Sequence, residues 1–136
     1  MRFGRSLKPF RRPLLWAGLW CAAVAAVVAL SLTPTPDLGS LPSGTDKLEH
    51  FLVYAALAAG AVQLYPRWRS LLSVGIALVL MGIGLEYAQG MLTDYRMADR
   101  LDALANTLGV IAGLGVQLTP WRDVLLRLDG GRDRSA

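Results

Sequence analysis

Four long apolar stretches dominate the chain, and each is close to the length that a membrane-spanning helix requires. They run from residues 14 to 33, 48 to 65, 71 to 92 and 101 to 119. About 20 mostly apolar residues are enough to cross the hydrocarbon core of a bilayer as an α-helix. Pro34, Pro66 and Pro120 directly follow the first, second and fourth stretches, and proline cannot continue a helix. The pattern therefore predicts an all-α integral membrane bundle of four transmembrane helices.

The composition favours a membrane protein over a soluble domain. Hydrophobic residues make up 54% of the 136 residues and charged residues 18%, whereas soluble domains average about 45–50% and about 25%. The net charge of +4 does not indicate nucleic-acid binding, because the basic residues flank the apolar stretches instead of forming a basic face. The single cysteine, Cys21, lies inside the first stretch, so neither an intrachain disulfide nor a cysteine-based metal site is expected.

The distribution of lysine and arginine predicts the orientation of the helices. Eleven of these residues lie before the first stretch, between the second and third, or after the fourth, and three lie in the other two loops: Lys47, Arg96 and Arg100. Because basic loops stay on the cytoplasmic side, we predict a multi-pass protein of the bacterial inner membrane with both termini cytoplasmic. Residues 1–13 are then a basic cytoplasmic N-terminus, 14–33 the first helix, 34–119 a region with the other three helices, and 120–136 a basic cytoplasmic tail.

Each end of the chain leaves an alternative open. The first apolar stretch follows a basic segment, as in a signal peptide, but it is longer than the 7–15 apolar residues of a signal sequence, which favours an uncleaved helix. The tail from Trp121 onward, with Arg122, Leu125 and Arg127, is predicted to be either a short amphipathic helix on the anionic inner leaflet or a frayed terminus.

The unusual polar residues all fall at one level of the predicted bundle. His50, the only histidine, lies at the start of the second helix, Glu86 lies near the end of the third, and Asp102 lies at the start of the fourth. Antiparallel helices bring these segments together at the outer face. Charged groups inside a membrane are costly and usually face partners in the bundle interior, so we predict an outward polar pocket. Its candidate binding residues are Asp46, Lys47, His50, Tyr54, Glu86, Gln89, Arg96, Asp102 and Asn106.

These residues also have purely structural interpretations. Asp99, three residues before Asp102, resembles a helix N-cap followed by an acidic first turn. Lys47 and Glu49 would be solvated residues at the membrane boundary. The deeper candidate residues would form a polar network that fixes helix register without performing chemistry; they are Glu86, Gln89, Asp102 and Asn106. Gly109 and Gly113, four residues apart, predict a face on which another helix approaches closely.

Three blocks of the sequence resemble the VanZ-like family of small bacterial membrane proteins. The blocks are Asp46-Lys47-x-x-His50-Phe51-x-x-Tyr54, Gly84-x-Glu86-x-x-Gln89, and Arg96 with Asp102-x-x-x-Asn106-x-x-Gly109-x-x-x-Gly113. The resemblance covers about half of the chain, within region 34–119, and leaves out the first helix and the tail. Where many members have Ser or Thr before the last helix, this chain has Asp99, which is compatible with an N-cap. The resemblance implies a role in the cell envelope, with an association with antibiotic resistance, but it does not supply a reaction.

Two functions fit these residues, and the sequence does not decide whether the protein is an enzyme. The favoured one is a binding or accessory role, in which the outer pocket recognises a lipid head group, a cell-wall precursor or a glycopeptide, and Lys47 and Arg96 hold phosphate or carboxylate. The alternative is an intramembrane hydrolase or transferase acting on a lipid-linked phosphate or acyl substrate. Its acid/base pair would be His50 with Glu86 or Asp102.

Expected partners follow from the same residues. Membrane lipid is expected, and nucleic acid is not. No cofactor is predicted, and a metal is disfavoured because two members of the cluster are basic. A transporter or a purely structural subunit is also disfavoured, because the polar groups stop at one face of the bilayer. The oligomeric state is left open.

Overall fold

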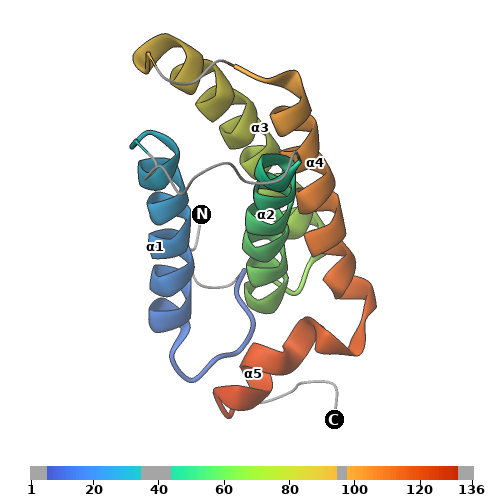
Figure 1. Cartoon of the computed structure of the whole chain (residues 1–136). Coiled ribbons are helices and arrows are strands. Elements are labelled where there is room, and N and C mark those ends of the chain that lie inside the picture. Colours follow the sequence, from blue (N-terminus) through green and yellow to red (C-terminus); the bar gives the residue numbers. More distant parts are fainter. Residues whose placement is uncertain (1–5, 35–43, 95–97, 132–136) are drawn as a thin grey trace.

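The computed structural model describes residues 6–34, 44–94 and 98–131, and these residues are all α-helical in class (Figure 1). The α-helices are α1 (Pro13–Ser31), α2 (Thr45–Leu64), α3 (Trp68–Leu92), α4 (Arg100–Leu114) and α5 (Val124–Leu128). Two short 3₁₀ turns, η1 (Gly115–Leu118) and η2 (Pro120–Asp123), join α4 to α5. The described ranges contain no strand. The predicted all-α class is confirmed for this part of the chain, and the four long helices begin and end within a few residues of the predicted stretches.

Three helical segments of the described residues are long and apolar enough to cross a membrane. They are Pro13–Ser31, Trp68–Leu92 and Arg100–Leu118, the last of which joins α4 to η1. Helix α2 has 20 residues, yet it falls outside this set because charged residues occupy its first turns. Three of the four predicted spans are therefore found among the described residues, and the second predicted stretch forms a helix, α2, with a polar start.

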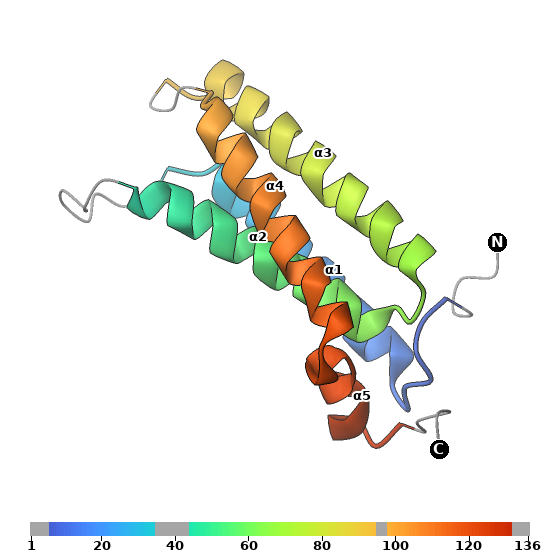
Figure 2. The same cartoon turned by 90° about the vertical axis from the view of Figure 1, so that its right-hand side faces the viewer.

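The four long helices run along one another in alternating directions (Figures 1 and 2). Helix α2 contacts α1, α3 and α4, and the main apolar core lies where α2, α3 and α4 meet. Its buried members are Tyr54, Leu57, Ala58, Leu78 and Val110. Helix α1 lies at the edge, because none of its residues, all of which are described, is buried. We call the end where α1 and α3 finish the polar end, and the opposite end the termini end.

Large apolar side chains cover much of the outside of the bundle. The exposed ones on the long helices include Leu19, Leu30, Leu52, Leu72, Ile76, Leu80, Ile83, Leu108 and Ile111. Soluble helix bundles turn such residues inward and expose a polar face. The surface of this bundle is suited to contact with hydrocarbon.

Helices α2 and α4 approach each other at two glycines. A Cβ atom on Gly109 would lie 2.3 Å from the carbonyl oxygen of Phe51, and one on Gly113 would lie 2.3 Å from that of Ala55. Both positions therefore exclude any side chain. The predicted close-approach face of the fourth helix is confirmed, and its partner is the backbone of α2.

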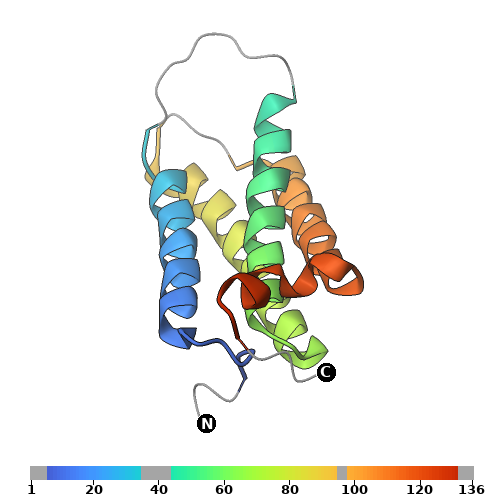
Figure 3. The same cartoon turned by 90° about the horizontal axis from the view of Figure 1, so that it is seen from below.

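The tail is folded against the termini end. Helix α5 crosses this end of α2, as Figure 3 shows. The buried Lys8 ammonium donates hydrogen bonds to the carbonyl oxygen of Val62 at 2.8 Å and pairs with Asp123 at 2.9 Å. The indole of Trp16 donates to Asp129 at 2.9 Å. Residues 120–131 are thus ordered and contain the short helix α5, packed on the bundle and not frayed; the position of this helix on the inner leaflet stays a prediction.

The α2–α4 contact predicts the effect of adding a side chain. Gly109→Leu should lower the free energy of unfolding by roughly 1–3 kcal/mol, because overpacking displaces the α2 backbone. Gly84→Leu is the matched control, since a Cβ there would meet no atom of another helix within 4 Å. Thermal unfolding in detergent and the amount of protein in membranes measure both. Equal behaviour of the two variants would contradict the contact.

Candidate functional site

Seven polar side chains from α2, α3 and α4 meet at the polar end. We call this group the polar cluster; its members are Asp46, Lys47, His50, Glu86, Asp99, Asp102 and Asn106. On α2, residue 50 lies four positions after residue 46 and three after residue 47, so it shares a face with each, and residues 102 and 106, four positions apart, share a face of α4. The two helices begin at the polar end and present these faces to each other.

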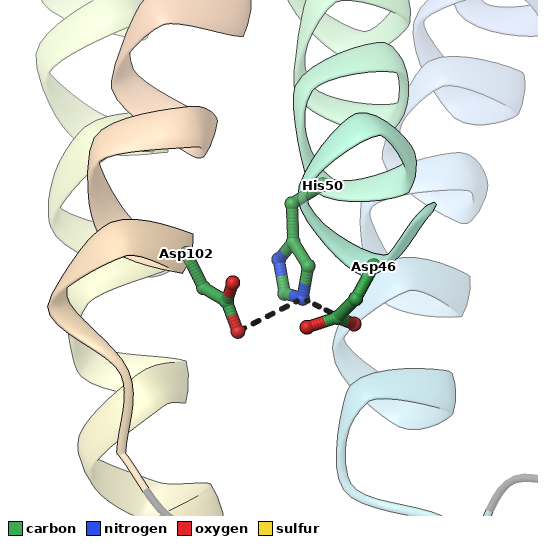
Figure 4. A group of neighbouring side chains, drawn as sticks. All are labelled: Asp46, His50 and Asp102. Carbon is green, nitrogen blue, oxygen red and sulfur yellow. Dashed lines mark ion pairs between the residues drawn. The ribbon is translucent and has the colours of Figure 1, made fainter. Parts of the chain in front are cut away.

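His50 lies at the centre of the polar cluster. Its Nδ1 lies 3.0 Å from Oδ1 of Asn106 and 3.8 Å from Oε1 of Glu86. Its Nε2 lies 3.6 Å from Oδ1 of Asp46 and 3.7 Å from Oδ2 of Asp102, as Figure 4 shows. The one histidine of the chain therefore contacts side chains from all three helices that carry the polar cluster.

Lys47 bridges the starts of α2 and α4. Its Nζ donates hydrogen bonds to Oδ2 of Asp99 at 3.0 Å and to Oδ1 of Asp102 at 3.1 Å. These two bonds raise the pKa of the Lys47 ammonium, and the bond from Lys47 is the main cause that lowers the pKa of Asp99. The positive charge of Lys47 is thus already engaged by two carboxylates.

Asp99 has two roles, of which the sequence predicts only one. Its carboxylate accepts a hydrogen bond from the backbone N–H of Leu101 at 2.8 Å, which is the predicted N-cap of α4. Its own N–H donates to Glu86 at 3.3 Å, and its other carboxylate oxygen binds Lys47. The sequence signals for Asp99, its position three residues before Asp102 and its place before the last helix, indicate a cap and do not reveal its pairing with Lys47.

The cluster has a buried floor and an exposed rim. The side chains of Glu86 and Asp102 are 6% and 9% exposed, whereas that of Asp46 is 51% exposed. Lys47 and Asp99 are also about two-fifths exposed. Asn106 is buried beside Gly82, where a Cβ atom would lie 3.0 Å from its Nδ2. A ligand that reaches the polar end would therefore meet Asp46 and Lys47 first.

Two predicted site residues lie apart from the polar cluster, and a third lies outside the described residues. The side chain of Gln89 donates to the carbonyl oxygen of Ser31 at 2.6 Å and so ties α3 to the end of α1. Tyr54 lies one turn deeper, inside the apolar core. Arg96 lies outside the described residues.

The polar cluster carries an excess of negative charge. Among the described residues, four carboxylates in the cluster face one ammonium and one imidazole. A cluster of this sign attracts cations. Asp46, His50 and Asp102 also each offer one metal-ligating atom, and these three atoms lie within 4.8 Å of one another (Figure 4).

Comparisons of this chain with known protein families, curated proteins and solved structures found no match. The VanZ-like resemblance therefore depends on the three sequence blocks alone.

The pKa of Asp99 predicts an acid limb in the stability profile. A carboxyl whose pKa is lowered on folding stabilises the fold at pH values above its unfolded pKa of about 4, and this contribution is lost as the pH falls through the folded pKa. Asp99→Asn keeps an N-capping side chain but removes the charge. Its thermal midpoint should fall less steeply than that of the wild type below about pH 4. The exposed Asp94 provides the control: Asp94→Asn should retain the wild-type slope, and identical slopes for all three proteins would contradict the role of the Lys47–Asp99 pair.

Proposed function

We propose that this chain is a VanZ-like protein of the bacterial cytoplasmic membrane that crosses the bilayer four times, with both termini in the cytoplasm. The alternating directions of α1 to α4 and the apolar outside of the bundle support four spans. Helix α2 is compatible with a span despite its polar start, because it contacts all three other long helices. Polar groups at membrane depth are tolerated where neighbouring protein covers them.

The described basic residues support this orientation. Those at or near the termini end are Lys8, Arg11, Arg12, Arg67, Arg69, Arg122 and Arg127, whereas Lys47 and Arg100 lie at the polar end. Basic segments are retained on the cytoplasmic side. The polar cluster then faces outward, towards the periplasm or cell wall.

The function that fits this placement best is the binding of the polar head group of an envelope amphiphile, such as a lipid, a lipid-linked cell-wall precursor or a glycopeptide. The observation that carries it is the half-exposed rim above a buried polar floor. A network that served only helix register would have no need of an open side. The acyl chain of such a ligand would lie along the apolar outside of the bundle while its head group enters the rim.

The charge of the pocket restricts how the head group is held. Lys47 is already paired with Asp99 and Asp102, so it is poorly placed to neutralise a phosphate alone. Asp46, with an exposed carboxylate, offers a negative contact. A ligand bound here therefore presents positive charge to the rim, or is held through a cation.

A head-group series tests this function. The purified protein in detergent would be mixed with phosphatidylethanolamine, phosphatidylglycerol and a polyprenyl-linked cell-wall precursor, and binding measured by native mass spectrometry. We expect a preference for one head group, and a loss of roughly tenfold or more in its affinity in Asp46→Asn, the size of one charge-assisted hydrogen bond. Glu49→Gln, an exposed acid on the same helix, should bind like the wild type. Equal binding of all head groups, or by both variants, would refute the proposal.

A second candidate function is an intramembrane hydrolase or transferase acting on a lipid-linked phosphate or acyl group, and the environment of His50 favours it. Asn106 holds one ring nitrogen, while the other faces Asp102 close to the rim. An imidazole held in this way is suited to move a proton to or from a bound substrate.

Turnover separates the enzyme from the binding protein. If the enzyme is correct, labelled lipid-linked substrate is converted by the wild type, and His50→Gln lowers the rate by roughly 10²-fold or more while it still accumulates in membranes. Binding without turnover in the wild type would rule out the catalytic role and leave the binding function.

A further inference from the structure

We propose that Asp46, His50 and Asp102 bind a divalent transition-metal ion of the zinc or manganese class at the rim of the polar cluster. The inference deepens the head-group function proposed above, and its biological role depends on that function. The metal site itself rests on the geometry of the three side chains.

The spacing of the three ligand atoms is close to that of a metal site. Ligands about 2.1 Å from a tetrahedral ion lie about 3.4 Å from one another. Here Nε2 of His50 lies 3.6 Å from Asp46 and 3.7 Å from Asp102, and all three atoms lie within 4.8 Å of one another. A small movement of the half-exposed Asp46 side chain would bring the three atoms around one ion.

The surroundings of His50 orient the ring for this role. Its Nδ1 faces two oxygen acceptors, Asn106 Oδ1 at 3.0 Å and Glu86 Oε1 at 3.8 Å, so the ring is suited to the tautomer with its hydrogen on Nδ1 when Nε2 binds an ion. Its Nε2 then points between two carboxylates. Metal-ligating histidines commonly donate their second ring N–H to a fixed acceptor in this way. Gly82 leaves the space in which the Asn106 amide lies.

The sequence disfavoured a metal because two residues of the candidate set are basic; of these, Lys47 does not occupy the site, and Arg96 lies outside the described residues. The Nζ of Lys47 binds Oδ1 of Asp102, whereas Oδ2 of the same carboxylate faces His50. Lys47 thereby fixes the plane of the Asp102 carboxylate and leaves the second oxygen for an ion.

The ligand set indicates the class of ion and its use. One imidazole with two carboxylates suits zinc or manganese better than calcium or magnesium, which prefer all-oxygen shells. Three protein ligands leave at least one coordination position for an exogenous group. At the exposed rim, that position would accept a phosphate or carboxylate oxygen of the head group, so the ion supplies the positive charge that Lys47 cannot.

The test measures binding of the metal alone. The full-length protein in detergent, stripped with a chelator, is titrated with Zn²⁺ by calorimetry, and with Co²⁺ while its visible absorption is recorded. We expect one ion per chain, a cobalt spectrum that disappears in His50→Gln, and an affinity at least tenfold lower in Asp46→Asn. Glu49→Gln serves as the matched acidic control and should bind like the wild type.

Asp46→Asn keeps the test decisive if His50→Gln fails to fold, because Asp46 lies at the rim and is half exposed. The absence of saturable binding of one ion in the wild type, or equal affinity of Asp46→Asn and the wild type, would overturn the metal site.

Failure of the head-group function gives a different result. Zinc would then bind as expected, and no head group would be preferred with or without it. If the stripped protein fails to bind zinc in the titration and yet prefers one head group, the metal site is overturned and the proposed function stands.

Discussion

The contact on which the rest of the bundle depends is the approach of α4 to α2 at Gly109 and Gly113. The carbonyl oxygens of Phe51 and Ala55 occupy the space that side chains at these glycines would need. In a bilayer, apolar side chains gain little by leaving lipid for one another, so close packing of this kind contributes much of the helix association. Sliding α4 by one turn, about 5.4 Å, would leave a glycine at only one of the two contacts and bring Ala105 or Gln117 to the other, which would separate the helices.

This packing also determines the geometry of the polar cluster. Asp102, Asn106, Gly109 and Gly113 follow one another at spacings of four, three and four residues, so the site and the glycine contact share one face of α4. The register that places the glycines on α2 therefore also places Asp102 and Asn106 against His50. The structural and functional interpretations of the polar residues are compatible for this reason: the buried floor holds register, and the exposed rim is available for a ligand.

Sequence patterns predict the helices and most of the cluster because both depend on spacing along the chain. Apolar length and the prolines define the helices, and intervals of three and four residues place the polar side chains on facing stripes. The exceptions depend on partners without a sequence signature. Gln89 binds a backbone carbonyl at the end of α1, and any residue at position 31 would supply one. Lys47 is paired with Asp99 as well as Asp102. The pair with Asp99 could not be predicted from spacing, because it depends on where the N-cap of α4 lies relative to α2.

The antiparallel arrangement explains how so many carboxylates share one end of the bundle. Helices α2 and α4 both begin there, and a helix N-terminus carries a partial positive charge. Asp46 and Asp102 lie in the first turns of these helices and Asp99 caps one of them, so each gains from a helix end as well as from its side-chain partners. The helix ends and Lys47 reduce the cost of an anionic pocket without filling it. Asp46 and the oxygen of Asp102 that faces His50 are the carboxylate groups that would hold the proposed cation.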